Sequence, residues 1–389
     1  TDGGIYRSTN GGTVWANITN GIHTSTFYHM AGAAFDANKI MGGTQDNGVK
    51  YKKDANDFTH VTGADGFDCS FGPTAGSSIY ATVNSSLAKF DMNGTELSIT
   101  TPANTAFFPV IAVNPANTNE VYLVGGAASL TNSAGTPIPP CGVQKSINGG
   151  STWTQVLNQN IQQSICVCPN NYSRLYVTGT NSIYRSDNNG TSWSTNLALN
   201  SGFPGSGSIT DINVCTGNSD LVFVTIGGFT ANRKVYYSSN AGASWQNVSG
   251  TLPAELNVNC VAVDLYNNAY IGTDMGVFYQ SAVNSDWTPY FNDLPRVPVT
   301  DLVIHQASSK IRASTYGHGI WETGLFTTCD ADLNLAGYIA GEKFYQVSND
   351  ITSNATITGA DGTIVTTRAG HEIVLSDGFT VTERNTYNG

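Results

Sequence analysis

The sequence predicts an all-β protein built from a repeated unit, and three observations lead to this prediction. Only 12% of the 389 residues are charged, whereas 42 are glycine, a turn-rich composition that disfavours long helices. Short runs in which apolar and polar residues alternate recur along most of the chain, as expected of half-buried strands. One turn motif and weaker copies of it return at intervals of about 40 to 55 residues, a spacing typical of repeat architectures.

The turn motif reads Ser-x-Asn-x-Gly-x-[Thr/Ser/Val]-Trp and occurs four times. Each copy lies between two short β runs and therefore predicts the turn of a hairpin. Ser and Asn side chains can bond nearby backbone groups, Gly permits positive φ, and Trp can pack a large apolar surface beneath the turn. The Asn and Trp residues of the copies are Asn10 and Trp15, Asn148 and Trp153, Asn188 and Trp193, and Asn240 and Trp245.

This motif resembles the Asp-box, or BNR, repeat of sialidase-like and sortilin-like β-propellers, with Asn in place of the usual Asp in all four copies. The resemblance implies that these turns are structural and lie on the face opposite the one that binds ligands. Function is then expected in the loops that join second to third strands and one blade to the next.

Weaker copies of the repeat fill the gaps and give six complete blades between about residues 25 and 295. Residues 1–20 supply a third and a fourth strand, while residues 299–322 supply a first, a second and a third. If these ends share one blade, the ring closes with seven blades and the two ends hold each other. We therefore expect a β-propeller of about seven blades over residues 1–326.

After residue 329 the repeat stops, and residues 330–389 predict a second domain. Its short β runs recur about every ten residues and are separated by glycines, which suits a small stacked-β or solenoid-like module. This region is similar to the stacked-β domain that follows propellers in secreted Bacteroidota proteins exported by type IX secretion. That resemblance implies an extracellular or cell-surface location.

Several classes of function are disfavoured by composition. The formal net charge of −11 excludes a nucleic-acid binder built on a basic face, and no run of about 18 apolar residues predicts a membrane span. The first residues lack the pattern of a signal peptide, so a signal peptide has been removed or an N-terminal region is missing. The six His and seven Cys show no metal-binding spacing, so no metal and no cofactor are predicted.

The loops of one rim contain the predicted ligand-binding residues. A long insertion, residues 127–141, is expected to stand on the same rim. The candidates are polar or aromatic residues in the expected loops: Asp46, Asn47, Asp65, Asp68, Asp274, Tyr316 and His318.

Asp46, Asp65 and Asp274 are also the candidates for catalysis. An acid/base pair needs carboxyl groups in unequal environments, and a glycoside hydrolase is one such chemistry. The alternatives for Asp46, Asp65 and Asp68 are turn formation and calcium binding. The segment around Asp274 resembles the Thr-Asp-x-Gly-x-aromatic loop that carries a catalytic Asp in two-propeller xyloglucanases, whereas this chain contains a single predicted propeller. A sialidase is disfavoured because no Arg-Ile-Pro sequence occurs.

The cysteines suggest one disulfide. Cys168 and Cys215 occupy equivalent places at the ends of inner strands in consecutive blades, so they could form an inter-blade bridge. Buried free thiols are the alternative.

Three functions remain open. The leading hypothesis is a noncatalytic binding or adhesion protein that recognises a glycan or a surface protein, because the scaffold is complete and no catalytic set is. The first alternative is a glycoside hydrolase that acts on a polysaccharide through rim aspartates. The second is a structural subunit of an extracellular assembly that joins other copies of the chain.

Overall fold

The computed structural model describes most of the chain. The residues outside its description are 1–4, 19–24, 56, 103, 104, 106, 126–141, 206, 282–285, 292, 293, 327–332, 340–342, 347–349, 359–363, 370, 371, 383–385 and 389, together with the side chains of 343–346, 364, 366, 368, 387 and 388. The predicted rim insertion, residues 127–141, therefore lies outside the described residues. The chain divides into two compact units, residues 1–325 and 326–389.

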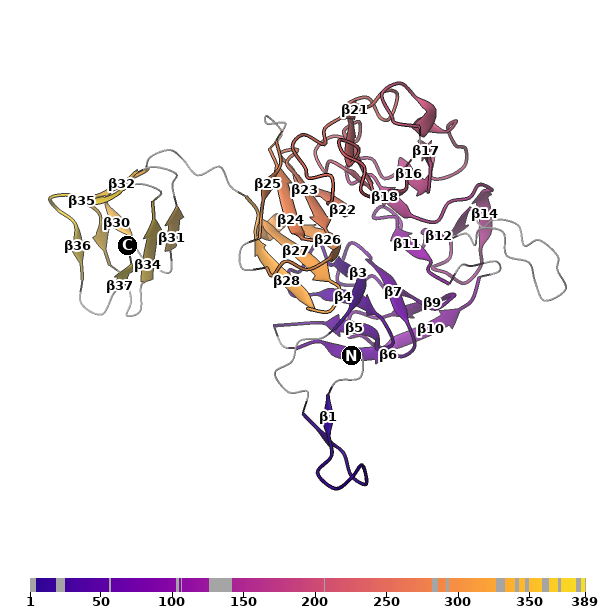
Figure 1. Ribbon diagram of the computed structural model, residues 1–389, viewed down its shortest axis with the longest axis horizontal. Coiled ribbons are helices and arrows are strands. Elements are labelled where there is room, and N and C mark those ends of the chain that lie inside the picture. Colours follow the sequence, from indigo (N-terminus) through magenta and orange to yellow (C-terminus); the bar gives the residue numbers. More distant parts are fainter. Residues whose placement is uncertain are drawn as a thin grey trace. The chain divides into compact units, whose positions relative to one another are not determined.

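The first unit contains a ring of seven antiparallel sheets, so the predicted seven-bladed β-propeller is confirmed (Figure 1). In chain order, blade 1 is β3 (Phe27–Gly32), β4 (Ile40–Thr44), β5 (Gly48–Lys52) and β6 (Thr59–Thr62). Blade 2 is β7 (Gly66–Phe71), β8 (Ile79–Val83), β9 (Ser86–Phe90) and β10 (Glu96–Thr100). Blade 3 is β11 (Val110–Val113), β12 (Val121–Val124), β13 (Val143–Ser146) and β14 (Thr154–Leu157).

The remaining blades follow the same order. Blade 4 is β15 (Ser164–Val167), β16 (Leu175–Gly179) and β17 (Ser182–Ser186), and blade 5 is β18 (Ile209–Val214), β19 (Val222–Ile226), β20 (Val235–Ser238) and β21 (Gln246–Asn247). Blade 6 is β22 (Val258–Val263), β23 (Ala269–Thr273), β24 (Gly276–Gln280) and β25 (Thr288–Pro289). Blade 7 is β26 (Val299–His305), β27 (Lys310–Thr315) and β28 (Ile320–Gly324). Two short 3-10 helices, η1 (Leu197–Leu199) and η2 (Gln306–Ser308), lie between strands.

The core of the ring lies between neighbouring blades. The second strands β4, β8, β12, β16, β19 and β23 are buried at every position, because each packs against a blade on both faces. Strands buried on both faces read as continuous apolar runs, which is why β12 has the sequence Val-Tyr-Leu-Val. Outer strands are more exposed, as in β10.

The ring is closed by contacts between blades 7 and 1. Asp301 on β26 accepts a hydrogen bond from the backbone N–H of Met30 on β3 at 2.9 Å, and the Thr300 hydroxyl donates to the Phe27 carbonyl at 2.9 Å. The Gly319 N–H donates to the Ser25 carbonyl at 3.1 Å. Side-chain and loop contacts therefore perform the closure.

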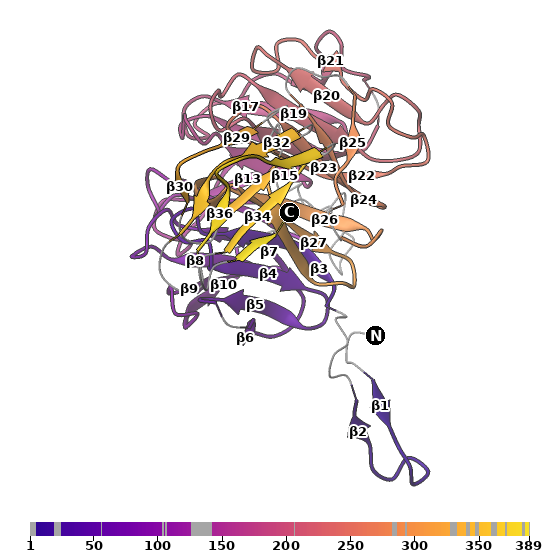
Figure 2. The same ribbon diagram turned by 90° about the vertical axis from the view of Figure 1, so that its left-hand side faces the viewer.

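The predicted sharing of one blade by the two ends of the propeller is wrong. β1 (Tyr6–Arg7) and β2 (Ala16–Asn17) pair with each other as a separate two-stranded hairpin (Figure 2). The physical reason is that β28 already fills the third-strand place of blade 7 beside β27. A second third strand, β1, has no vacant position there.

The four turn motifs form the same hydrogen bonds. In the copy of blade 3, Asn148 Oδ1 accepts from the Ser146 hydroxyl at 2.9 Å and from the Thr152 N–H at 2.9 Å, while Ser146 Oγ accepts from the Gly150 N–H at 2.9 Å. The glycine at the turn has a φ of 90°, which favours glycine over any residue with a Cβ. The copies at Asn10, Asn188 and Asn240 repeat these bonds.

The second unit is a parallel β-solenoid of three coils. Its three sheets each stack one strand from every coil in parallel, with Leu335, Ile351 and Val365 in the core. The strands are β29 (Leu333–Leu335), β30 (Tyr338–Ile339), β31 (Lys343–Gln346), β32 (Asp350–Ser353), β33 (Thr356–Ile357), β34 (Ile364–Arg368), β35 (Glu372–Leu375), β36 (Thr380–Val381) and β37 (Thr386–Asn388).

Within the part of the chain that the structure describes, no helix is both long and apolar enough to span a bilayer.

Candidate ligand-binding face and central channel

The first strands of the blades surround a central channel. A cavity with about 700 Å³ of empty space, part of it open to solvent, lies along the axis of the ring. Its lining comes mainly from the first strands of the seven blades, β3, β7, β11, β15, β18, β22 and β26. Because these strands run along the axis of the ring, one side chain in two points toward the channel. Its polar lining includes His29, Asp68, Asp211, Asn259 and Asp301.

Three of these aspartates join consecutive blades in the same way. Asp68 accepts from the N–H of Cys69 at 2.8 Å and, across the blade boundary, from that of Ile111 at 2.8 Å. Asp211 accepts from Ile212 at 2.8 Å and from Val261 of the next blade at 3.0 Å.

Asp301 repeats this arrangement with Leu302 at 2.7 Å and Met30 at 2.9 Å. The strand register shifts at each of these three sites, between Gly66 and Cys69, between Ile209 and Asp211, and between Val299 and Asp301. These bulges direct the carboxylates toward the neighbouring strand.

Asp68 is therefore not the loop residue that the sequence predicts. It lies on β7, is buried, and uses both carboxylate oxygens to hold backbone N–H groups. Its physical role in the structure is to connect blade 2 to blade 3.

Burial dominates the electrostatics of the channel. It raises the pKa of Asp68 to about 6 and that of Asp211 to about 6, against the hydrogen bonds that favour their ionised forms. For His29, burial lowers the pKa, but the hydrogen bond and charge of Asp301 together with the charges of Asp68 and Asp211 outweigh it and raise the pKa to about 9. His29 Nδ1 lies 3.7 Å from Asp301 Oδ2, and 41% of the His29 side chain faces the water of the channel.

The sequence analysis missed His29, Asp211 and Asp301. A signal for the two aspartates was present, since both follow an apolar residue and a threonine and precede another apolar residue at the start of an inner strand. A carboxylate at the same register in repeated inner strands indicates a group that points into the axis of the ring. His29 had no comparable signal.

Asp46 and Asp65 are brought together at the rim. The Asp46 N–H donates to Asp65 Oδ1 at 2.7 Å, so the carboxylate of the loop between blades 1 and 2 holds the turn between β4 and β5. Asp46 is exposed and has a φ of 56°, a conformation suited to a turn. The Asn47 side chain donates to the Gln45 carbonyl at 3.0 Å in the same turn.

Asp274 lies in the equivalent turn of blade 6. Its Oδ1 accepts from Asn259 Nδ2 at 3.1 Å, and the same amide donates to the Val299 carbonyl at 2.9 Å. The structure therefore couples Asp274 to a channel-lining amide and to the start of blade 7.

Tyr316 and His318 lie in the corresponding turn of blade 7. The Tyr316 hydroxyl donates to Gln45 Oε1 at 3.3 Å, which places this turn beside that of blade 1 across the ring closure. The His318 N–H donates to the Thr315 hydroxyl at 3.1 Å, and the His318 imidazole is exposed.

An aromatic cluster that the sequence analysis missed lies next to Asp65. Tyr28 and Phe67, from the first strands of blades 1 and 2, have ring centroids 5.3 Å apart, and Phe67 packs on Phe108 at 4.4 Å and Phe107 at 5.3 Å. Phe107 and Phe108 remain 49% and 54% exposed. The adjacent Phe-Phe pair in the loop between blades 2 and 3 was the available signal.

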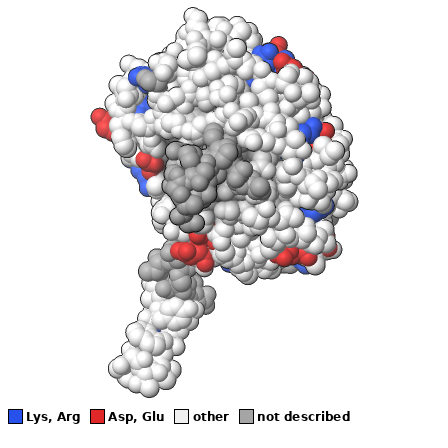
Figure 3. All heavy atoms as spheres, turned by 90° about the vertical axis from the view of Figure 1, so that its right-hand side faces the viewer, with Lys and Arg blue, Asp and Glu red and all other residues white. Residues whose placement is uncertain are grey.

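This face combines exposed aromatic rings with hydrogen-bonded carboxylates and amides. Among the described residues, no group of three or more His, Cys, Asp or Glu is arranged to hold a metal ion. Charged side chains are sparse and of mixed sign on the side of the molecule that Figure 3 shows. Exposed rings beside carboxylates and amides already fixed by hydrogen bonds form a pre-organised surface.

The predicted Cys168–Cys215 disulfide is wrong for this structure, in which both residues are free thiols. Cys168 packs in the core between blades 4 and 5, whereas Cys215 packs in the core between blades 5 and 6. The sheet of blade 5 separates these two cores. The Cys215 thiol also donates a hydrogen bond to Asn267 Oδ1.

No protein-family model matches the chain, and no curated protein sequence does. Among solved structures, the GH74 xyloglucanase from Xanthomonas campestris is similar, with a TM-score of 0.58 and 14% identity over 77% of this chain and 52% of that chain. The chain thus spans about half the length of that structure. At this identity the similarity shows the β-propeller fold that the two proteins share.

Proposed function

We propose that this protein is a secreted or surface-displayed binding protein that recognises a glycan through the rim of its propeller. One observation carries the proposal: Tyr28, Phe67, Phe107 and Phe108 form an aromatic cluster in which Phe107 and Phe108 are exposed. Phe67 of this cluster follows Asp65, whose carboxylate is held by the Asp46 N–H, by two residues in the chain. The C–H face of a sugar ring packs on such rings, and its hydroxyls bond to neighbouring carboxylates and amides.

The state of the rim carboxylates supports binding over hydrolysis. Asp65 holds the Asp46 turn, and Asp274 accepts from Asn259. A glycoside hydrolase of either stereochemistry needs one carboxyl group that donates a proton and a second at a defined distance across the scissile bond. The aspartates at the rim serve instead as acceptors that maintain loop structure.

A glycoside hydrolase is the second candidate, because the propeller fold is similar to that of a xyloglucanase and the segment around Asp274 resembles the Thr-Asp-x-Gly-x-aromatic loop of two-propeller xyloglucanases. In this case Asp274 would act with a carboxylate from outside the described site.

The test is a panel of plant, algal and host polysaccharides, assayed for both binding and release of reducing ends. We expect binding without turnover, and we expect Phe108→Ala to weaken it by about tenfold, since losing a buried aromatic contact costs about 1.4 kcal/mol or more. Tyr266→Ala is the matched control, because Tyr266 is 77% exposed in a loop between first and second strands, on the opposite face. Turnover that Asp274→Asn abolishes would establish the hydrolase instead.

A further inference from the structure

The hairpin of β1 and β2 carries a tryptophan that none of the described residues of its own ring covers. Trp15 is 60% exposed, whereas the tryptophans at the equivalent place of blade 5, Trp245, and of the last turn of blade 6, Trp287, are 4% and 6% exposed. Val14 and Tyr6 of the hairpin are also exposed, at 64% and 49%. Exposed apolar side chains concentrated on so small an element are typical of an interaction surface.

In the ring, each such tryptophan packs on the preceding blade. Trp245 shares a core cluster with Ile183 and Leu197 of blade 4, and its indole N–H donates to the Leu197 carbonyl at 3.0 Å. Trp287 donates in the same way to the Val248 carbonyl of blade 5 at 2.7 Å. The tryptophan thus acts as a wedge between two blades.

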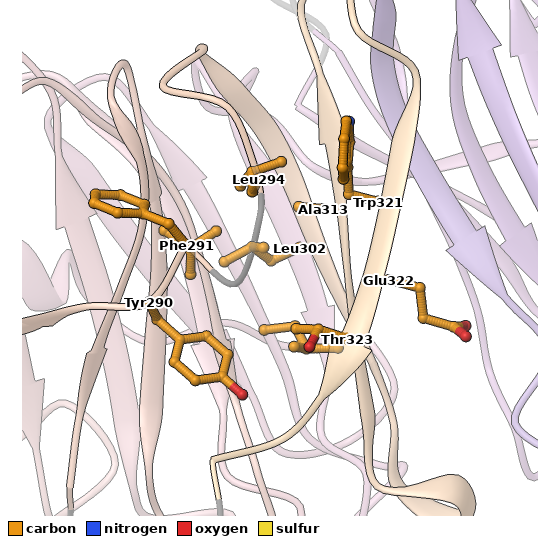
Figure 4. Close-up of a pocket in the computed structure, with 10 residues that line it drawn as sticks. Tyr290, Phe291, Leu294, Leu302, Ala313, Trp321, Glu322 and Thr323 are labelled. Carbon is orange, nitrogen blue, oxygen red and sulfur yellow. The ribbon is translucent and has the colours of Figure 1, made fainter.

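Blade 7 has the socket for this wedge but no tryptophan to fill it. None of the six tryptophans follows Trp321 on β28, and a partly open pocket lies between blades 6 and 7, with about 330 Å³ of space that includes open solvent. Figure 4 shows Leu294, Leu302 and Ala313 around the middle of this pocket, with the Phe291 ring at one side and Trp321 at the other, while Glu322 points away. The lining residues are Val277, Tyr290, Phe291, Leu294, Leu302, Ile311, Ala313, Trp321, Glu322 and Thr323.

The register of the strands shows that this pocket is the tryptophan socket. Ala313 faces Trp321 across blade 7 as Val224 faces Tyr236 across blade 5. Leu302 pairs with Ala313 as Ile212 pairs with Val224. Ile212, Val224 and Tyr236 all belong to the cluster that surrounds Trp245.

The strand beside the pocket is also an edge. Among the described residues, the sheet of blade 7 ends at β28, whereas blades 1, 2, 3, 5 and 6 each carry a fourth strand outside the third. An edge strand offers backbone donors and acceptors to another strand. Trp321 on this edge is 38% exposed.

We propose that the hairpin of residues 5–18 from one copy of the chain docks along β28 of a second copy and inserts Trp15 into the pocket between blades 6 and 7. The Trp15 wedge, or knob, and its socket lie on different parts of the chain, so the contact between copies is heterologous and extends head to tail. The proposal is independent of glycan binding, because the socket lies between the blades and uses none of the residues of the aromatic cluster at the rim.

The test measures molar mass by light scattering and sedimentation over a wide concentration range. We expect the mass of the whole chain to rise with concentration. Trp15→Ala is expected to shift the midpoint of association upward by at least about tenfold, as for a central aromatic at an interface. Phe229→Ala, at another exposed aromatic (68% exposed), is the control and is expected to leave the midpoint unchanged.

Two socket variants complete the design. Ala313→Leu and Thr323→Trp each place extra side-chain volume in the pocket. Thr323 is half-buried at the edge of blade 7, so we expect Thr323→Trp to fold. Each is expected to be monomeric alone, and a mixture with Trp15→Ala is expected to form a dimer that grows no further, because one intact knob meets one intact socket. A wild-type chain that stays monomeric throughout, or mixed variants that fail to pair, would overturn the proposal.

Discussion

The carboxylate of Asp301 accepts the backbone N–H of Met30 at 2.9 Å and thereby joins the last blade of the propeller to the first, across 271 residues of sequence. Asp68 with Ile111 and Asp211 with Val261 make the same bond between blades that are consecutive in the chain. Ring closure therefore uses the same interaction that connects blades elsewhere. Because blades 7 and 1 are not consecutive in the chain, their connection depends on such noncovalent contacts.

Replacing Asp301 should loosen the ring. In Asp301→Asn the amide offers a single oxygen where the carboxylate accepts from both Leu302 and Met30, so one buried N–H loses its acceptor. We expect a loss of about 1–3 kcal/mol in the free energy of unfolding, measured by urea titration. Glu96→Gln, on the exposed outer strand β10, is the control and should change little. Equal stability of Asp301→Asn and wild type would show that closure rests on other contacts.

The channel should make stability fall as pH rises. His29 has a folded pKa of about 9 against an ordinary value of 6.5, so its contribution is complete below pH 6.5 and is lost as pH rises through 9. Asp68 and Asp211 have a folded pKa of about 6 against 3.8, so their neutral forms favour the folded state and this contribution is lost between pH 4 and 6.

The measurement is the difference in unfolding free energy between wild type and variant at each pH, because carboxylates with a lowered pKa, such as Asp187, act in the opposite direction at low pH. His29→Gln should remove the dependence between pH 6.5 and 9 and move the lower window upward, because the charge of His29 lowers the pKa of Asp68. A difference that stays constant from pH 6.5 to 9 would contradict the role assigned to the imidazole.

The turn motif predicts a contrast between two substitutions of one residue. Asn148→Ala removes the acceptor of Ser146 Oγ–H and of the Thr152 N–H and should cost about 1–2 kcal/mol of stability. Asn148→Asp keeps that acceptor and loses only the amide that donates to the Thr152 hydroxyl at 2.8 Å, which can itself donate to a carboxylate. We expect Asn148→Asp to remain within about 0.5 kcal/mol of wild type. Thermal unfolding of both variants provides the comparison, and equal losses would mean that the acceptor is unimportant.

The five cysteines that the structure describes should be unreactive in the native state. Cys69, Cys168, Cys215 and Cys260 are buried free thiols, and burial raises the pKa of Cys69, Cys168 and Cys260. Burial also raises the pKa of the half-buried Cys166 to about 12. Because the thiolate is the nucleophile, a thiol reagent should modify these residues only after denaturation. Peptide mapping without reductant should recover Cys168 and Cys215 unbridged; a linked peptide pair would restore the disulfide.

The sequence by itself determined the blades and their turns. Alternating runs define strands because side chains point to opposite faces of a sheet, and Asn148 and its counterparts form their turns with residues at most four positions away. Such local interactions can be predicted from a short window. The seven-bladed propeller and the rim loops around Asp46 and Asp274 followed from this local order.

The tertiary structure alone decided which of these residues meet. Asp301 reaches Met30 only when the ring closes, and Tyr28 reaches Phe108 only when the first blades pack around one axis. Asp68 is a buried link between blades and not the loop ligand that the sequence predicts, because a shift in strand register turns its carboxylate inward. The pocket beside Trp321 also depends on the packing of two blades, because residues of both blade 6 and blade 7 line it.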